Sequence, residues 1–409
     1  MNKMNKKVVF TICAKNYLAQ ALSLKESTLR HNDVDFHIFL SDDVDSEVLP
    51  EVVKLEESWI PNWRNMAFKY DVIEFSTSIK PYCFKKLFEQ GYEKVCYLDP
   101  DIYVFNCMDV VFEGLNEKSI LLTPHRCHIS NTEDDMISEQ MVSSVGIYNC
   151  GFIAVKNNKT GNDLVDWWIK RLSNQCLCDL AHGLFVDQKW IDFVPGFFPK
   201  DVLISDHLGL NVATWNLQER QVYEEDGHLF VRSPFTKQVF PLIFFHFSGY
   251  NPHNPMLLHK RKEKSDLRFF PEMKRMVAEY REAEMRNEYE RYSKMKYSFN
   301  IFSDGISILS FHRRLYYRNL QKTKTIDDPF DCKGYLYALY TKRGLIDNKR
   351  HVSSNYHIAK MSHMNLKQIS VYSLLRLLGI KCYLKLLEKL STIASYSYYD
   401  FLVTEELER

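Results

Sequence analysis

The run Val8-Val9-Phe10-Thr11-Ile12-Cys13 opens the part of the chain that decides the fold. Behind it, apolar residues recur at helical spacing over residues 17–29, and the segment 36–40 then alternates between apolar and polar residues. A strand, a helix and a strand in this order predict a βαβ unit, which places the two strands side by side and parallel.

A second unit of the same kind follows. Residues 71–75 are expected as a strand or loop, residues 81–90 as a helix that ends at Gly91, and residues 94–98 as a buried strand. This alternation predicts an α/β fold with a mostly parallel, doubly wound sheet and helices on both faces. In such sheets ligands bind at the carboxyl ends of the strands, so the residues after Cys13, Leu40 and Leu98 become candidates for a site.

The remaining segments extend this pattern and then change character. Apolar runs predict further strands at 120–124, 148–155, 192–195 and 239–247, and a helix at 161–172 with Trp167 and Trp168 on its inner face. Later segments are dense in charged residues or leucine. They predict one or two amphipathic helices within 258–297 and a helix over 370–390 that breaks near Gly379.

The charge of the 409-residue chain is divided between its two parts. Residues 1–250 carry 24 basic and 34 acidic side chains, whereas residues 251–409 carry 29 and 18, so a total of +1 hides −10 and +11. This asymmetry predicts two modules with different partners. We expect a catalytic domain at 1–255 and a basic, mainly α-helical C-terminal domain at 256–409.

Composition also excludes several classes of protein. The 14% of aromatic residues argues against a disordered chain, and no apolar run approaches the roughly 18–20 residues that span a bilayer. The apolar run at 8–13 is too short for a signal peptide, and ten cysteines without regular spacing indicate reduced thiols and a cytoplasmic location. Cys176, Cys178 and His182 leave a zinc site open as an alternative, although a second ligand pair is missing.

The strongest chemical signal is Tyr97-Leu98-Asp99-Pro100-Asp101-Ile102-Tyr103-Val104. Two carboxylates one residue apart, at the end of a buried strand and on a turn set by Pro100, can converge on one divalent cation. They would leave open coordination positions for phosphate oxygens. The alternative is a solvated Asp-Pro turn between two strands.

Several blocks in a fixed order resemble a known family. TIC-x-K-N-Y at 11–17, LSDD at 40–43, Lys80-Pro81, KVCYLDPDIYVF at 94–105, YNCGFIAV at 148–155, VDQKW at 186–190 and HFSGY at 246–250 are similar in layout to GT-A-fold nucleotide-sugar glycosyltransferases. The layout is similar to that of the bacterial family 8 type and of related capsule- and lipopolysaccharide-assembly enzymes. The resemblance covers about residues 8–255 and implies a GT-A, Rossmann-like catalytic fold.

The resemblance implies a metal site at Asp99, Asp101 and His246. An imidazole beside two carboxylates favours Mn²⁺ over Mg²⁺. His246 also follows the apolar run 242–245, so a core histidine remains the alternative. The family's Lys-Pro-Trp after this block is replaced here by Asn251-Pro252-His253, which leaves open which group adds positive charge near the leaving diphosphate.

The resemblance also implies residues that hold the donor and the acceptor. Asp187 and Gln188 would be catalytic, with a helix-capping role as the alternative for Asp187. Asn211, Trp215 and Asn216 would lie near the acceptor, and Gly151 and Phe152 would follow the ligand-binding turn. The nucleotide-sugar donor would be bound by Thr11, Cys13, Lys15, Asn16, Tyr17, Asp42, Asp43, Lys80, Asp99, Asn149 and Gly249, several of which could instead be turn, packing or surface residues.

The implied activity is metal-dependent transfer of a sugar from a nucleotide-diphosphate sugar, with a UDP-sugar favoured, to a saccharide or lipid-linked saccharide. Such an enzyme would serve bacterial surface polysaccharide synthesis and would retain the anomeric configuration. An inverting enzyme stays open because Glu133, Asp134 and Asp135 could supply a base. A non-catalytic sugar-nucleotide-binding protein on this fold, or a nucleotidyl- or phosphotransferase, are further alternatives.

The basic half predicts a docking function. Clusters of two or three basic residues lie at 260–262, 313–314 and 342–343. Together with the apolar helix expected at 370–390, they suit contact with anionic lipid or a lipid-linked acceptor. We therefore expect a cytoplasmic protein with peripheral contact to the inner face of the membrane. A lid or oligomerisation module is the alternative, and no motif indicates nucleic-acid binding.

Overall fold

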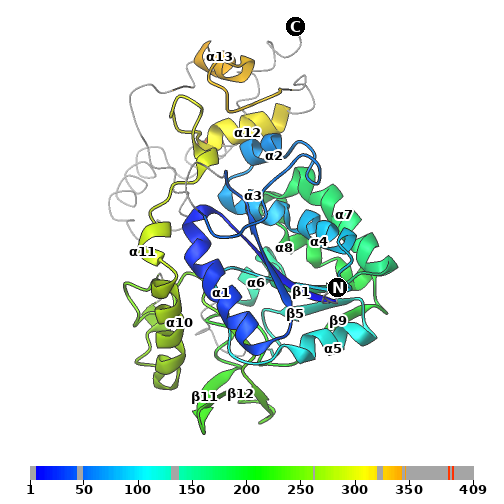
Figure 1. Ribbon diagram of the computed structural model, residues 1–409, viewed down its shortest axis with the longest axis vertical. Helices are drawn as coiled ribbons and strands as arrows, with labels where there is room; N and C mark the ends of the chain where they lie inside the picture. The colour runs from blue at the N-terminus through cyan, green and yellow to red at the C-terminus, as the bar shows by residue number, and fades with distance from the viewer. Residues whose placement is uncertain are drawn as a thin grey trace. The chain divides into compact units, whose positions relative to one another are not determined.

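The computed structural model describes residues 6–43, 49–129, 138–260, 263–319 and 326–342, together with residues 346, 386, 389 and 390. The chain forms two compact units, of which the first comprises residues 1–63 and 72–297 and the second residues 64–71 and 298–409 (Figure 1). These units group residues by contact, so the expected division of function at residue 255 stays a prediction. The acidic residues 133–135 and almost all of the helix expected at 370–390 lie outside the described residues.

The first unit is built on a six-stranded sheet. Its strands lie in the order β2-β1-β3-β6-β5-β9. The pairings β1–β2, β1–β3 and β5–β9 are parallel, while β6 is antiparallel to both neighbours, so that β6 alone is reversed. The predicted α/β fold with a mostly parallel sheet is confirmed. The strands are β1 (Lys7–Cys13), β2 (Asp35–Leu40), β3 (Lys94–Leu98), β5 (Ile120–Pro124), β6 (Tyr148–Lys156) and β9 (Val202–Ile204).

Helices cover both faces of this sheet, as predicted. Val9 and Cys13 of β1 share an apolar cluster with α1 (Leu18–His31) and α5 (Asp109–Glu117). The next residue in the alternation, Phe10, faces the other way and packs edge-on against Phe84 of α4, with 4.9 Å between ring centroids. Behind α4 (Lys80–Glu89) lies α7 (Lys159–Gln175). Burying both faces explains why the strands read as nearly continuous apolar runs.

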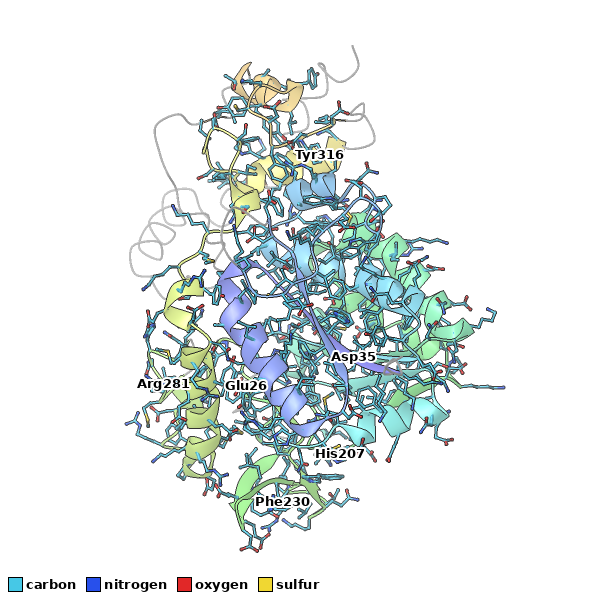
Figure 2. The ribbon with its side chains drawn as sticks, in the orientation of Figure 1. Glu26, Asp35, His207, Phe230, Arg281 and Tyr316 are labelled. Carbon is cyan, nitrogen blue, oxygen red and sulfur yellow. The ribbon has the colours of Figure 1, made fainter. Side chains whose placement is uncertain are left out.

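A smaller sheet places one predicted ligand. It has the order β10-β14-β4, from β10 (Val212–Ala213), β14 (Phe244–His246) and β4 (Ile102–Val104). The strand predicted at 239–247 is therefore split, because Val239–Pro241 forms β13 and joins a separate sheet with β11 (Gln221–Glu225) and β12 (His228–Arg232). Phe230 lies on β12 in that sheet (Figure 2). Shorter elements are α6 (Glu139–Val145), β7 (Cys178–Asp179) and β8 (Leu184–Phe185).

Two segments, one expected as a strand or loop and one as a strand, are largely helical instead. Residues 72–75 lie in α3 (Val72–Ser78), and residues 192–195 form the turn after α8 (Gln188–Ile191) and the start of α9 (Val194–Phe197). A short apolar run does not distinguish strand from helix, and Pro195 lies in the first turn of α9, where its missing N–H has no cost. Trp168 of α7 is fully buried, but Trp167 is only half-buried, so its expected inward position was wrong.

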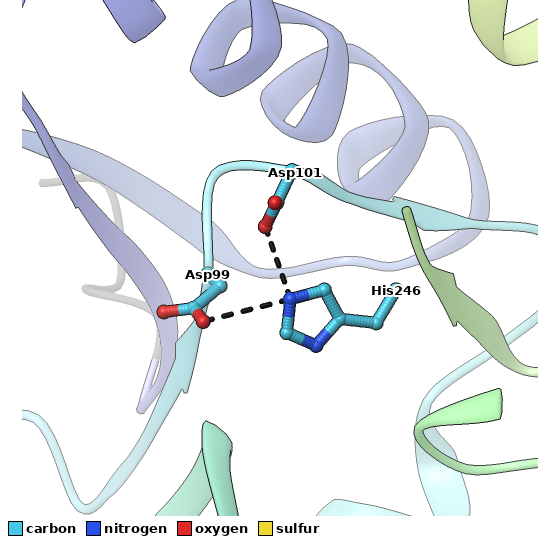
Figure 3. A group of neighbouring side chains, drawn as sticks. All are labelled: Asp99, Asp101 and His246. Atoms are coloured by element: carbon cyan, nitrogen blue, oxygen red, sulfur yellow. Dashed lines mark ion pairs between the residues drawn. The ribbon is translucent and has the colours of Figure 1, made fainter. Parts of the chain in front are cut away.

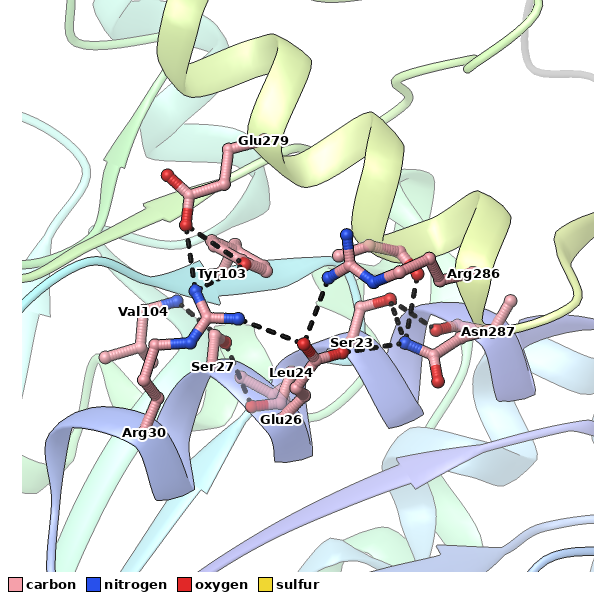
Figure 4. A network of polar contacts seen from close by, with 12 residues as sticks. Ser23, Leu24, Glu26, Ser27, Arg30, Tyr103, Val104, Glu279, Arg286 and Asn287 are labelled. Carbon is pink, nitrogen blue, oxygen red and sulfur yellow. Dashed lines mark hydrogen bonds and ion pairs between the residues drawn. The ribbon is translucent and has the colours of Figure 1, made fainter.

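The charged segment 258–297 contributes one long helix and one short one to the first unit. These are α10 (Lys274–Arg286) and α11 (Tyr289–Tyr292). Figure 4 shows how α10 is tied to α1 by ion pairs: Arg30 bonds to Glu279 and Arg286 bonds to Glu26, each at 3.0 Å. The polar face of α10 is thus partly committed to α1, and the described helix is shorter than the sequence pattern suggests.

The second unit joins an early segment to late helices. It contains α2 (Trp63–Lys69) from residue 64 onward, α12 (Ser310–Asn319) and α13 (Tyr335–Lys342). Arg313 of α12 is buried and donates hydrogen bonds to the carbonyls of Ala67, Phe68 and Tyr70 at 2.6–2.9 Å. Arg313 was expected among the basic residues that contact lipid, but its guanidinium instead caps the C-terminal end of α2 by these hydrogen bonds. Among the described residues no helix is long and apolar enough to cross a bilayer.

Candidate functional site

Asp99, Asp101 and His246 meet at the end of β3 (Figure 3). The two aspartates lie on the turn between β3 and β4, and β14 pairs with β4 so that His246 lies opposite Ile102. The Nε2 atom of His246 is 3.1 Å from Asp101 Oδ1 and 3.6 Å from Asp99 Oδ2. One potential ligand atom from each residue lies within 4.8 Å of the others. The three side chains predicted as metal ligands are therefore together.

The surroundings of the three residues set their charge and orientation. Burial opposes a charge on His246, but Asp101 and then Asp99 outweigh it and raise the pKa of the imidazole. The Tyr97 hydroxyl donates to Asp99 Oδ1 at 2.6 Å, and the Trp215 ring meets the imidazole edge-on at 5.1 Å. Two carboxylates and one nitrogen form a donor set that suits a divalent transition metal such as Mn²⁺.

Gly151 makes room for this arrangement. Because β6 is reversed, its beginning lies at the same edge of the sheet as the end of β3, and the Asp99 amide donates to the Gly151 carbonyl at 2.8 Å. A Cβ at residue 151 would lie 2.5 Å from Cε1 of His246 and 2.8 Å from Oδ2 of Asp99. Any larger residue would therefore displace the candidate ligands.

A buried ion pair lies next to the three residues. Lys80, in the first turn of α4, places Nζ 2.5 Å from Oδ2 of Asp187 and 2.8 Å from the Cys150 carbonyl, and 4.0 Å from the centre of the Tyr97 ring. Both side chains are almost fully buried, at 1% and 3% exposure. Burial opposes the charge on Lys80, but Asp187 and then Asp99 overcome it and raise the pKa of the lysine.

Amide side chains link this pair to the neighbouring strand ends. Buried His125, after β5, has its pKa lowered to about 4 mainly by burial, so its ring is neutral near pH 7. Its Nδ1 faces the Ile147 carbonyl at 3.2 Å and must carry the proton, which leaves Nε2 to accept from Asn149 at 3.1 Å. The Asn149 oxygen then accepts from the Gly151 amide and from Asn211.

Gln188 is held by the same network. Its Oε1 accepts from the Cys150 amide at 3.1 Å and its Nε2 donates to the Val145 carbonyl at 3.0 Å. Asn216 bonds to the backbone of Asn211 and Ala213, which keeps Asn211 at a positive φ of 54°. The amide groups expected to contact sugars are thus bound to the protein and fix one another's orientation.

The predicted residues of the first two strands lie at the same sheet edge. Asp42, after β2, accepts from the backbone amides of Lys15 and Asp43 at 3.3 and 2.8 Å. Thr11 and Cys13 are buried in β1, and Asn16 is partly exposed. Tyr17 is 39% exposed, and burial of its hydroxyl together with Asp101 raises its pKa. Gly249 has a φ of 73° and lies against His259, so no described contact joins it to the other residues.

Two residues of this region were missed from the sequence. His125 follows a predicted strand at its carboxyl end, and the rule used for Asp99 would have found it. Glu284 of α10 is buried, and Asp101 is among the charges that act on it, but nothing in its local sequence indicates this.

The alternative zinc site does not assemble in the described residues. The sulfur of Cys176 lies 3.3 Å from the Thr77 hydroxyl, and His182 is bonded to Asp179. The described side chains that could hold a metal ion together are Asp99, Asp101 and His246.

Comparisons with known proteins give relatives without an assigned activity. No family model matches the chain. Two proteins of Bacillus subtilis (strain 168), the uncharacterised YfnF and YfnD, are 28% identical over 251 residues and 25% identical over 253 residues. Each match covers 59% of this chain, and the matches cover 80% of YfnF and 76% of YfnD.

Three solved structures resemble parts of the chain. They are a glycosyltransferase involved in the glycosylation of the major capsid of PBCV-1, the galactosyltransferase LgtC in complex with donor and acceptor sugar analogs, and mouse xyloside xylosyltransferase 1. Their identities are 13%, 14% and 13%, with TM-scores of 0.34, 0.41 and 0.32. They cover 60%, 68% and 51% of this chain, and 94%, 95% and 87% of their own.

Proposed function

We propose that this protein is a metal-dependent glycosyltransferase that uses a nucleotide-diphosphate sugar. The observation that carries the proposal is the meeting of Asp99, Asp101 and His246 at the carboxyl edge of the sheet, directly beside the Lys80–Asp187 pair. A cation held at this edge would lie where such folds bind their ligands and could stabilise negative charge on a departing diphosphate. The named glycosyltransferases with a similar fold are compatible with this function.

The residues present fit a divalent cation. Asp99 and Asp101 remain partly exposed, with 29% and 19% of their side chains accessible, so that their outer oxygens can be reached from solvent. His246 would offer Nε2, the atom that already points between the two carboxylates. When bound, Mn²⁺ or Mg²⁺ would neutralise negative charge that develops on a departing diphosphate.

Lys80 and Asp187 would influence the donor without touching it, because both side chains are almost fully buried. Because Lys80 is buried and bonded to Asp187 and the Cys150 carbonyl, its charge would act on a donor through the low-dielectric interior rather than by direct contact. Asp187 would hold Lys80 at the end of β3, and Gln188 would hold the Asn149–Cys150 strand end. We therefore propose Gln188 as a positioning residue, and Asn149 as the residue through which His125 sets the shape of the donor site.

The finer features of the activity are also proposals. A UDP-sugar as donor, a saccharide or lipid-linked saccharide as acceptor, retention of configuration and a part in bacterial surface polysaccharide synthesis rest on the sequence blocks that resemble family 8-type enzymes. The anomeric configuration of the first-formed product, read by proton NMR, separates retention from inversion. The peripheral membrane contact of the basic C-terminal region rests on its charge.

A second candidate is a sugar-nucleotide-binding protein that does not catalyse transfer. The observation in its favour is that Asp187 and Gln188 are only 2% and 7% exposed and have their polar atoms bonded to protein. Such a protein would bind the nucleotide sugar with Mn²⁺ without turnover.

The test is a panel of UDP-, GDP- and CMP-sugars with Mn²⁺, followed by thermal shift and by release of the nucleoside phosphate. We expect one nucleotide sugar to stabilise the protein and to be hydrolysed only when Mn²⁺ is present. Asp101→Asn should abolish the hydrolysis that requires Mn²⁺. Asp109→Asn, which changes an acid of α5 that is 65% exposed, should leave this hydrolysis unchanged. Full activity of Asp101→Asn would contradict the proposal, as would nucleotide-sugar binding that is equally strong with and without Mn²⁺.

A further inference from the structure

Four aromatic side chains form a cluster at the surface of the first unit. Trp167 of α7 meets Trp190 of α8 at 6.2 Å and Phe197 of α9 at 5.3 Å, measured between ring centroids. Phe193 lies between Trp190 and Phe197, at 6.3 and 5.7 Å. Each ring therefore touches two others, and we call these four residues the aromatic cluster.

The cluster faces solvent. Phe193 and Phe197 are 52% and 51% exposed, and a Cβ built on Gly196 between them would meet no atom within 4 Å. The neighbouring residues Ile191 and Val194 are fully buried and hold the segment on the core. Positions 190, 193 and 197 are thus the outward face of two short helices, and they carry aromatic residues where a water-facing helix has polar ones.

One basic side chain contacts this apolar face, and others lie next to its residues in the sequence. The Arg171 guanidinium lies over the Trp190 ring, 5.8 Å from its centre, and exposed Lys170 precedes it on α7. Exposed Lys200 follows Phe197 and Phe198 in the sequence, and its backbone carbonyl accepts a hydrogen bond from Lys118 at 2.7 Å. Three acids, two on α7 and one in the turn after α8, are each bonded to a lysine within the protein, at 2.6–2.9 Å: Asp163, Asp166 and Asp192. Among the described acids, Glu117 and Asp201, which neighbour Lys118 and Lys200 in the sequence, have no such lysine partner.

We propose that the aromatic cluster is a contact surface for an anionic lipid bilayer. Phenylalanine at the most exposed positions, tryptophan at the edge and arginine or lysine around them are the residue types that lie at a membrane–water boundary. The rings would enter the acyl boundary, and Lys170, Arg171 and Lys200 would meet lipid phosphates. No described helix can span a bilayer, so the contact is with one leaflet.

The size of the cluster argues against a second protein chain as its occupant. A whole aromatic side chain presents about 150–250 Å², so four partly exposed rings offer on the order of 300 Å². A stable protein–protein contact needs about 800 Å² from each partner. A bilayer needs no matching surface and takes a small apolar patch with a basic edge.

One short helix, α8, connects the aromatic cluster to the proposed donor site. Gln188, at the beginning of α8, holds the strand end beside Asp99, and Trp190 is on the same helix. The aromatic cluster is therefore joined to the proposed donor site through α8. The cluster belongs to α7, α8 and α9 and not to residues 256–409, and the inference does not depend on sugar transfer.

The test is flotation of the full chain with vesicles of phosphatidylcholine alone or mixed with phosphatidylglycerol. The cluster variant is Phe193→Ser with Phe197→Ser. The matched control is Phe235→Ser with Phe269→Ser, which removes two phenylalanines that are 55% and 67% exposed elsewhere. All three proteins keep the same C-terminal region, so its own lipid affinity cancels in the comparison.

We expect the native chain and the control to float with the mixed vesicles, and the cluster variant to bind at least about tenfold more weakly. Lys170→Glu with Lys200→Glu should weaken binding to the mixed vesicles while leaving binding to phosphatidylcholine unchanged. Unchanged flotation of the cluster variant would overturn the proposal, as would a native chain that does not float. If the cluster variant floats like the native chain but sediments as a smaller species, the surface is instead a contact with a second copy of the chain.

Discussion

The carboxyl group of Glu284 on α10 gives a sharp test of the structure beside the candidate metal site. The side chain is 1% exposed, and its Oε2 has no hydrogen-bond partner among the described residues. Burial, opposed by a hydrogen bond from Tyr280 and reinforced by the charge of Asp101, raises the pKa of Glu284 from the usual 4.5 to about 8. The native protein therefore keeps this group neutral at pH 7, while the unfolded chain ionises it.

The sign of the effect on stability follows from these two pKa values. Below about pH 4.5 the group is neutral in both states and has no effect. Between 4.5 and about 8 only the unfolded state releases the proton, so the free energy of unfolding falls by about 1.4 kcal/mol for each pH unit. The accumulated loss is about 4–5 kcal/mol by pH 9, most of it already present at pH 7.

Glu284→Gln removes the titration and keeps the shape. We expect the variant to match the native protein near pH 4.5 and to become more stable than it as pH rises, by roughly 3 kcal/mol at pH 7 and 4–5 at pH 9. Urea unfolding followed by tryptophan fluorescence measures this in the right unit, because all six tryptophans lie within residues 1–63 and 72–297. Comparing the two proteins at each pH cancels every other titrating group.

Two results would refute the reasoning. A difference in stability between the two proteins that is the same at every pH would mean that Glu284 is not held neutral. Mn²⁺ provides the second check, because a cation at Asp101 would offset the charge that raises the pKa of Glu284. The pH dependence should then become smaller with Mn²⁺, and an unchanged dependence would place Glu284 out of reach of the site.

Four further substitutions, one of them a control, test other parts of the structure. Gly151→Ala would put a methyl group 2.5 Å from Cε1 of His246. We expect the Mn²⁺ affinity, measured by calorimetry, to fall at least tenfold and the free energy of unfolding to fall by about 1–3 kcal/mol. An unchanged Mn²⁺ affinity would contradict the packing around Gly151. Lys80→Met leaves buried Asp187 without its partner and should cost about 3–5 kcal/mol in urea unfolding. Lys85→Met, on the same helix as Lys80, breaks the exposed pair with Asp166 of α7 and should cost less than about 1 kcal/mol, so equal effects would argue against burial of the Lys80 pair. Arg313→Met removes the donors that end α2 and should raise hydrogen exchange across residues 64–71 without changing exchange in β1, whereas uniform exchange would refute the assignment of α2 to the second unit.

The sheet was predictable because its strands are buried on both faces and read as local apolar runs. β1, β2, β3 and β5 were placed within one or two residues, and Asp99 and Asp101 followed from the end of β3. Residues 72–75 and 194–195 are helical and were not predicted so, because a few apolar residues suit either structure until their neighbours decide. The strand expected at 239–247 is divided between β13 and β14, which belong to different sheets. The half-buried position of Trp167 could not be foreseen, since it depends on contacts with α8 and α9.

What the sequence by itself determined is the local part of the protein: which segments are strands or helices, and that two carboxylates follow a buried strand. Only the tertiary structure decided that His246 lies 3.1 Å from Asp101, because this depends on the register of β14 on β4. It also decided that Lys80 meets Asp187, that α10 brings Glu284 into the interior, and that the aromatic cluster faces solvent. Contacts between distant segments follow from how elements pack and pair, and no local pattern in a single sequence encodes that choice.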